Sequence, residues 1–236
     1  MTGGGQPEVG TAVPVSLPAL YPLPPIRYSD VDVLVLVPPG PLNVALPAPL
    51  APAGGISILM LSDYPKSDLG PYRELFVLTA ALHGTDLVWF CPLIYVTSDA
   101  ALAAGREIWG FPKKLADIAF ERTDGTVTAT VRRNEASLEI TGQLTVDLDV
   151  ASLVTPNDAI VNLRTIPSPD GGPADTQLVG VNLEFDRKSA RGGTAELASA
   201  SGPEDPLAEL LGSHGGCAIS VFHADVVLPY GRILGA

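Results

Sequence analysis

The chain has 236 residues, a formal net charge of −12 at pH 7 and an isoelectric point near 4.5, with 46% hydrophobic and 17% charged residues. A composition with this share of apolar residues predicts a folded chain with a large core rather than a disordered one. A chain this acidic lacks the basic face that nucleic-acid binding requires. The same charge repels small anions at long range, so any site for a carboxylate must be locally cationic.

Residues 1–20 are rich in Gly, Pro and Val and predict a mobile leader, or a segment laid across a neighbouring subunit, ahead of a single domain over residues 21–236. This start has neither the basic region nor the apolar run of a secretion signal, so we expect a cytoplasmic protein. Six prolines interrupt the apolar stretch 31–61, which argues against a membrane-spanning helix. Cys91 and Cys217 lie in apolar runs and predict buried, reduced thiols.

Strand signals dominate the rest of the chain, in chain order. Short runs rich in β-branched and aromatic residues predict strands at 30–37, 56–62, 74–81, 86–97, 137–144, 159–164, 177–185 and 218–228. Ser98 predicts the N-cap of a central helix of alanines that ends near Gly105, and residues 205–211 predict a second, short helix. Asp124-Gly125 predicts the turn of a hairpin between strands at 115–122 and 126–133. Many short strands with few helices predict a β-rich α+β fold, either a barrel or packed antiparallel sheets with a few short helices.

The most informative segment is Gly-Arg-Glu-Ile-Trp-Gly-Phe-Pro-Lys-Lys-Leu-Ala, residues 105–116. It places Lys113 and Lys114 between an aromatic-proline pair and an apolar, strand-like run. Apolar surroundings disfavour the charged form of a lysine, so a neutral, nucleophilic amine becomes available near pH 7. Such an amine attacks ketone carbonyls and forms a Schiff base, whose iminium accepts electrons.

Strand periodicity predicts which of the two lysines is buried. Alternate residues of a strand share a face, so Lys113 goes with Leu115 and Lys114 goes with the more apolar Ala116 and Ile118. The pattern alone therefore favours Lys114 as the buried lysine, unless the backbone after Pro112 is irregular. The opposite reading, in which both lysines are solvated in a turn before the hairpin, also fits the pair taken by itself.

The segment resembles the active site of the acetoacetate decarboxylase family, in which a lysine of a Pro-Lys-Lys triplet forms the Schiff base. Four other stretches carry the resemblance, which extends over residues 20–232: Gly70-Pro71-Tyr72-Arg73-Glu74, Pro156-Asn157, Ile166-Pro167, and Ser213-His214 with the run from Ala218 to Pro229. The resemblance implies a barrel-like fold, a homo-oligomer, and Lys113 as the nucleophile with Lys114 as its neighbour.

The same resemblance implies roles for further residues. It makes Glu74 the active-site glutamate that orients substrate and handles protons, and Arg27 the arginine that binds the substrate carboxylate. Where the better-known decarboxylases have a second glutamate, this sequence has Leu59, which predicts a larger or less polar substrate than acetoacetate. The aromatic residues Tyr95, Trp109 and Phe111 are candidates for an apolar wall that keeps water from the lysine.

These residues predict a lysine-dependent decarboxylase that converts a small β-keto acid to CO2 and a ketone without a metal or organic cofactor. A Schiff-base aldolase, dehydratase or cyclase of a biosynthetic pathway is the alternative, and a non-catalytic barrel that binds a small ligand is a third. His83, His214 and His223 lack metal-ligand spacing, and no phosphate-binding loop or nucleophile elbow is present.

Overall fold

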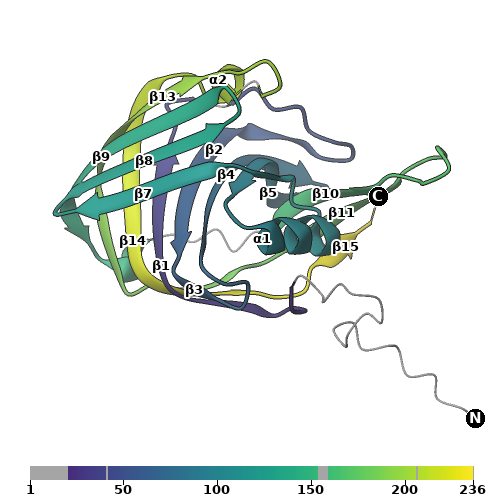
Figure 1. The fold of residues 1–236 in the computed structure, drawn as a ribbon, viewed down its shortest axis with the longest axis horizontal. Helices are drawn as coiled ribbons and strands as arrows, with labels where there is room; N and C mark the ends of the chain where they lie inside the picture. Colours follow the sequence, from purple (N-terminus) through teal and green to yellow (C-terminus); the bar gives the residue numbers. More distant parts are fainter. Residues whose placement is uncertain (1–20, 41, 154–158, 206, 236) are drawn as a thin grey trace, which may run out of the picture.

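The computed structural model describes residues 21–40, 42–153, 159–205 and 207–235 (Figure 1). The predicted leader, residues 1–20, and Pro156-Asn157 lie outside this part of the chain. The strands are β1 Ile26–Val37, β2 Ala51–Tyr64, β3 Lys66–Ser67, β4 Tyr72–His83, β5 Asp86–Val96, β6 Lys113–Leu115, β7 Asp117–Thr123, β8 Thr126–Arg133, β9 Ala136–Leu148, β10 Ile160–Ile166, β11 Asp175–Val181, β12 Glu184–Asp186, β13 Ser189–Ala200, β14 His214–Leu228 and β15 Arg232–Leu234.

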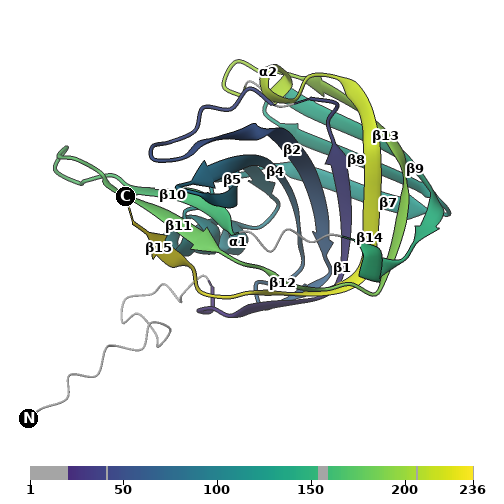
Figure 2. The ribbon, with the colours of Figure 1, turned by 180° about the vertical axis from the view of Figure 1, so that it is seen from behind.

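All these strands belong to one sheet, which curls strongly round on itself (Figures 1 and 2). Its strand order is β15-β11-β10-β5-β4-β2-β1-β14-β13-β9-β8-β7, with the short strands β3, β6 and β12 paired to β1, β5 and β14. Neighbouring strands run antiparallel except where β10 and β6 lie parallel to β5. The β7 end returns to β4, where a guanidinium nitrogen of Arg73 donates to the carbonyl of Ile118 at 3.3 Å. The predicted fold class, a β-rich fold with few short helices, is confirmed.

The curled sheet buries a separate core on each of its faces. The core that we call the α1 core takes alternate residues of β1, β2, β4 and β5 together with the helical segment after β5; its large members include Tyr28, Tyr72, Phe76, Ile94, Trp109 and Phe111. The core that we call the α2 core takes most of the other residues of these strands together with β7, β8, β9 and β13; its members include Leu59, Leu75, Tyr95, Phe120, Ile140 and Leu211. A third, smaller cluster, which includes Val88, Phe90 and Val161, lies where β5 meets β10. Side-chain alternation along a strand therefore decides which core each residue enters.

The helices are short and cover the ends of these cores. Helix α1 spans Asp99–Ala104, and the predicted cap is confirmed, because Oγ of Ser98 accepts a hydrogen bond from the backbone N–H of Ala101. A π-helical turn, η1 (Gly105–Trp109), continues it, a 3-10 turn η2 spans Val150–Ser152, and α2 spans Leu207–Leu211. No helix in the part of the chain described is long and apolar enough to cross a membrane.

Three strands, β3, β13 and β15, were not predicted from the sequence, and β12 was predicted only as a continuation of β11. Strand β13 reads Ser-Ala-Arg-Gly-Gly-Thr-Ala-Glu-Leu-Ala-Ser-Ala, which is poor in the residues that favour strands. It forms because β9 and β14 pair with it on both sides, so tertiary hydrogen bonding overrides local preference. Strand β3 and the edge strand β15 are too short to carry a sequence pattern.

Candidate active site

A buried ion pair between Lys113 and Glu74 forms the centre of the candidate site. The Nζ of Lys113 donates a hydrogen bond to Oε2 of Glu74 at 2.6 Å. The two side chains are only 5% and 9% exposed. A pair enclosed in this way interacts strongly because little water screens it. The amine and the carboxylate are therefore in direct contact, and a proton can move between them along one hydrogen bond.

Strand β6 separates the two adjacent lysines. It pairs in parallel with β5, so that Lys113 lies beside Ile94 of the α1 core and Lys114 lies beside Tyr95 of the α2 core. Periodicity alone favoured Lys114 as the buried residue, and this is wrong. The reason is that β6 ends before Ala116 and β7 begins after it, so the alternation of the later hairpin does not run back to the lysines.

Two glycines allow the helical segment to pack closely over the site. A Cβ on Gly105 would lie 2.6 Å from both Cδ and Cε of Lys113, so only glycine leaves room for the lysine stem. Gly110 has φ of 75°, and a Cβ there would lie 2.5 Å from the Cα of Arg164. The segment η1 is thus pressed against Lys113 at one end and against β10 at the other.

Aromatic rings enclose the Lys113 amine. Its Nζ lies 5.6 Å from the ring centroid of Phe111 and 5.7 Å from that of Tyr72. Trp109 packs on Phe111 with 6.3 Å between centroids, and its indole N–H donates to the carbonyl of Pro229 at 2.9 Å. Phe111 therefore faces the amine directly, and Trp109 lies against Phe111.

Three stacked tyrosines extend this group of aromatic rings. The ring of Tyr64 lies 4.7 Å from those of both Tyr28 and Tyr72, and the hydroxyl of Tyr72 donates to that of Tyr28 at 3.3 Å. Burial raises the pKa of all three phenols, and the negative charge of Glu74 raises it further. The three hydroxyls therefore stay neutral and bring no additional charge to the ion pair.

The two cysteines have different surroundings. Cys91 lies in the α1 core, where burial and the charge of Glu74 raise the pKa of its thiol. A thiol with a raised pKa is a poor nucleophile. Cys217 is exposed, so the prediction that both thiols are buried is wrong for this one.

Lys114 and Tyr95 belong to a second charged cluster, in the α2 core. The carboxylate of Asp205 accepts a hydrogen bond from the hydroxyl of Tyr95 at 2.5 Å and lies 3.5 Å from Nζ of Lys114 and 3.1 Å from Nε of Arg133. The sheet stands between this cluster and the Lys113–Glu74 pair. The structure therefore corrects two expectations: Tyr95 is not part of the wall around Lys113, and Lys114 does not reach the pair.

Two further predicted residues also lie away from the pair. Leu59 is buried in the α2 core, on the face of the sheet opposite Lys113, so it cannot make the surroundings of the lysine less polar. Arg27 is exposed between the buried residues Ile26 and Tyr28, and its backbone N–H donates to the carboxylate of Asp68 at 2.8 Å. Its guanidinium therefore points away from the α1 core, because neighbouring strand residues face opposite sides.

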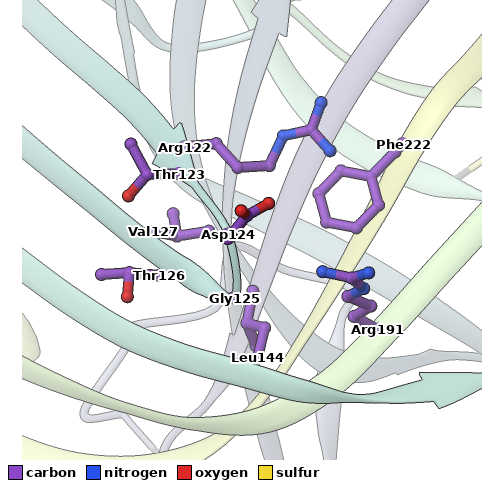
Figure 3. Close-up of a pocket in the computed structure, with 9 residues that line it drawn as sticks. All are labelled: Arg122, Thr123, Asp124, Gly125, Thr126, Val127, Leu144, Arg191 and Phe222. Carbon is purple, nitrogen blue, oxygen red and sulfur yellow. The ribbon is translucent and has the colours of Figure 1, made fainter.

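A separate cavity of about 310 Å³ lies at the far end of the sheet (Figure 3). Arg122 stacks on Phe222 at 4.1 Å and pairs with Asp32 at 3.1 Å, and Arg191 pairs with Asp147 at 2.9 Å, so both guanidinium groups are already neutralised. The cavity is lined by Arg122, Thr123, Asp124, Gly125, Thr126, Val127, Leu144, Arg191 and Phe222. This lining therefore includes no lysine, and Glu74 is also absent from it. Among the residues described, no three His, Cys, Asp or Glu side chains meet in a group that could hold a metal ion.

Comparison with known proteins identifies the family of the chain. Residues 12–235 match the family model described as acetoacetate decarboxylase (ADC). The chain belongs to the acetoacetate decarboxylase family. Its curated relatives include acetoacetate decarboxylase of Paraburkholderia phytofirmans, 29% identical over 213 residues, which cover 84% of this chain and 82% of the relative. Acetoacetate decarboxylase 2 of Mesorhizobium japonicum is 28% identical, covering 94% of this chain and 88% of the relative.

Solved structures share the acetoacetate decarboxylase fold with this chain. The acetoacetate decarboxylase of Legionella pneumophila superposes with a TM-score of 0.84 at 21% identity, covering 96% of this chain and 94% of that one. The enduracididine biosynthesis enzyme MppR, complexed with pyruvate, superposes with a TM-score of 0.76 at 17% identity, covering 96% and 98%. Identities this low establish the common fold alone.

Within this family fold, sequence reasoning missed two residues that contact the pair. Tyr72 precedes Glu74 by two positions in β4, and strand alternation could have placed both on one face. Gly105 carries no such signal, because its contact with Lys113 arises only when η1 packs over β6.

Proposed function

We propose that this protein is a Schiff-base decarboxylase of a small β-keto acid, with Lys113 as the nucleophile. The observation that carries the proposal is the 2.6 Å contact between the Lys113 amine and the Glu74 carboxylate inside an aromatic enclosure. Membership of the acetoacetate decarboxylase family supports the same chemistry.

The reaction proceeds through a covalent imine. Glu74 takes a proton from the Lys113 ammonium, and the free amine attacks the ketone carbon of the substrate. Glu74 returns this proton to the departing hydroxyl, and loss of water gives a protonated imine. The bond between the carboxylate and the adjacent carbon then breaks, and its electron pair moves into the C=N⁺ group to give an enamine and CO2. A proton from the solvent, relayed by Glu74, then adds to the enamine carbon, and water hydrolyses the resulting iminium to release the ketone and the protonated amine.

The surroundings of Lys113 suit the bond-breaking step. The negative charge of the substrate carboxylate disperses as CO2 departs, so an environment that solvates this charge poorly favours the transition state over the ground state. Phe111 and Tyr72 supply such an environment beside the amine. Arg27 has no part in this mechanism, because its side chain is exposed.

An aldol, dehydration or cyclisation reaction through the same imine is the second candidate. The observation that favours it is the shared fold with MppR, whose structures contain pyruvate or the condensation product of pyruvate and imidazole 4-carboxaldehyde. The first step would be the same attack by Lys113. The two candidates differ in whether CO2 is released.

Sodium borohydride trapping tests the proposal. The protein is incubated with a panel of β-keto and α-keto acids, CO2 is monitored, the imine is reduced, and the modified peptide is located by mass spectrometry. We expect a reduced adduct on Lys113 with CO2 release, kept in Lys114→Gln and lost in Lys113→Gln, with folding of both variants checked by circular dichroism. An adduct without CO2 supports the second candidate. Absence of an adduct with every acid contradicts both and favours a non-catalytic binding protein.

We also propose, from the family resemblance, that the chain forms a homo-oligomer and acts in the cytoplasm. Light scattering of the purified protein measures the first, and fractionation of the source cells measures the second.

A further inference from the structure

Asn162, in strand β10, is a fully buried polar side chain without a partner. Its exposed fraction is 0%, and among the described residues neither its Oδ1 nor its Nδ2 has a hydrogen-bond partner. A buried carboxamide normally makes hydrogen bonds, since leaving such a group unpaired is costly. An unpaired amide of this kind therefore indicates that something else binds there.

The side chain of Asn162 faces the α1 core. Alternate residues of β10 share a face, and its neighbour on that face, Ile160, belongs to the α1 core. Its cross-strand partner is Val179 of β11. A Cβ on Gly231 would lie 2.6 Å from Cγ1 of Val179 and 3.2 Å from Cδ1 of Trp109, so Val179 and Trp109 are close neighbours. Asn162 thus lies under the same helical segment that covers Lys113.

Strands β10 and β6 lie along the same edge of β5, one after the other. Ile160 pairs with Trp89 near the start of β5, and Lys113 pairs with Ile94 near its end, both in parallel register. Because Ile160 pairs with Trp89, Asn162, two residues further along β10, lies level with Cys91 of β5. Cys91 in turn precedes Ile94 by three residues. At about 3.3 Å per residue, Asn162 and Lys113 are about 10 Å apart along the strand.

The level of Asn162 lies within electrostatic range of the ion pair. Cys91, which is level with Asn162, feels the charges of both Glu74 and Lys113. A second unpartnered donor lies on the same face, because the indole N–H of the buried Trp89 also has no hydrogen-bond partner among the described residues. Neither Asn162 nor Trp89 carries a charge, so the group that they suit is neutral and polar.

We propose that Asn162, with Trp89, forms a binding subsite for a neutral hydrogen-bonding group, a hydroxyl or carboxamide, carried by the substrate several carbon atoms from its ketone. A hydroxyl could accept from Nδ2 and donate to Oδ1 of the carboxamide. This inference rests on the proposed function for the position of the ketone at Lys113. It makes Asn162 a specificity-determining residue and predicts a substrate longer and more polar at its far end than acetoacetate.

Equilibrium binding of two ketones tests the subsite without requiring any reaction. The probes are a five-carbon methyl ketone and its terminal hydroxyl analogue, and calorimetry measures their affinities. We expect the wild-type protein to bind the hydroxyl compound about 10-fold to 100-fold more tightly than the plain ketone, as one well-placed hydrogen bond to an otherwise unpaired group provides. The variant Asn162→Leu should lose this preference, and Asn162→Ser should reduce it in case the leucine variant folds poorly. Asn43 is exposed, so the variant Asn43→Leu is the matched control and should keep the preference for the hydroxyl compound.

The outcome separates the two proposals. Equal affinities for the two ketones in the wild-type protein, or a preference that persists in both Asn162 variants, would overturn the subsite and leave Asn162 bound to buried water. A preference that depends on Asn162, found together with no borohydride adduct on Lys113, supports the subsite and contradicts the Schiff-base chemistry. A borohydride adduct on Lys113 without a preference for the hydroxyl ketone supports the Schiff-base chemistry and contradicts the subsite.

Discussion

Lys113 and Lys114 are adjacent in the chain, yet their amines meet different carboxylates on opposite faces of one sheet. Nζ of Lys113 lies 2.6 Å from Glu74 in the α1 core, whereas Nζ of Lys114 lies 3.5 Å from Asp205 in the α2 core. Each lysine therefore has its own counter-ion, and substitution of one carboxylate should disturb only one of the two lysines.

Glu74→Gln should reduce both decarboxylation and stability. A buried ammonium that loses its counter-ion costs about 3–5 kcal/mol of unfolding free energy, and loss of the proton acceptor should lower kcat by about 100-fold or more. Denaturant unfolding and steady-state kinetics measure the two effects. Glu121→Gln, at an exposed position in β7, is the control and should change neither. Wild-type kcat in Glu74→Gln would remove Glu74 from the mechanism.

Asp205→Asn should lower stability but preserve trapping on Lys113. The change leaves Arg133 and Lys114 facing a neutral group, which we expect to cost about 1–2 kcal/mol, because these two side chains are 27% and 39% exposed and water compensates part of the lost pairing. The sheet separates this cluster from Glu74, so the borohydride adduct should form to the same extent as in the wild type at a temperature where the variant is folded. A loss of adduct without loss of fold would mean that the two cores are coupled.

Gly105→Ala should damage activity more than stability. The new methyl group would lie 2.6 Å from the Lys113 stem and must displace the amine, and a shift of about 1 Å at a reacting group can cost about 100-fold in rate. Alanine also favours helix by about 1 kcal/mol over glycine, which offsets part of the steric cost to folding. In Gly40→Ala nothing lies within 4 Å of the added methyl group, so this variant should behave as the wild type. Equal kinetics in the two variants would refute the proposed contact.

Stability should fall at alkaline pH. Because the pKa values of Tyr28, Tyr64 and Tyr72 are raised in the folded protein, the folded state keeps protons that the unfolded chain releases above pH of about 10. The contribution of these retained protons to the free energy of unfolding is fully present below that pH. It declines as pH rises above it, by about 1.4 kcal/mol per pH unit for each tyrosine. Unfolding free energies measured between pH 8 and 11 should show the decline, with a smaller slope in Tyr64→Phe. Phenolate absorbance that develops for all six tyrosines before the fold is lost would contradict it.

The sequence predicted those parts of the molecule that depend on local signals. The Ser98 cap, the Asp124-Gly125 turn and most strands follow from residue type and alternation, and the Pro-Lys-Lys block located Lys113. The surroundings of the lysine depend instead on strand register and on the break at Ala116, which no local pattern encodes. For the same reason Tyr95 and Leu59 were assigned to the wrong face, and Asn162 was not noticed.

Strands β10 and β6 pair with the same edge of β5, and this arrangement affects which amino-acid substitutions can alter substrate range. Lys113 and Asn162 lie on chain segments that are some fifty residues apart in sequence, although both segments pair with β5 and contact η1. Pro92, which has no N–H to offer, occupies the unpaired interval between them. Substitutions at Asn162 that leave Arg164 and its contact with η1 unchanged can therefore alter which molecules are accepted while the reactive amine keeps its geometry, so substrate range and chemistry can diverge.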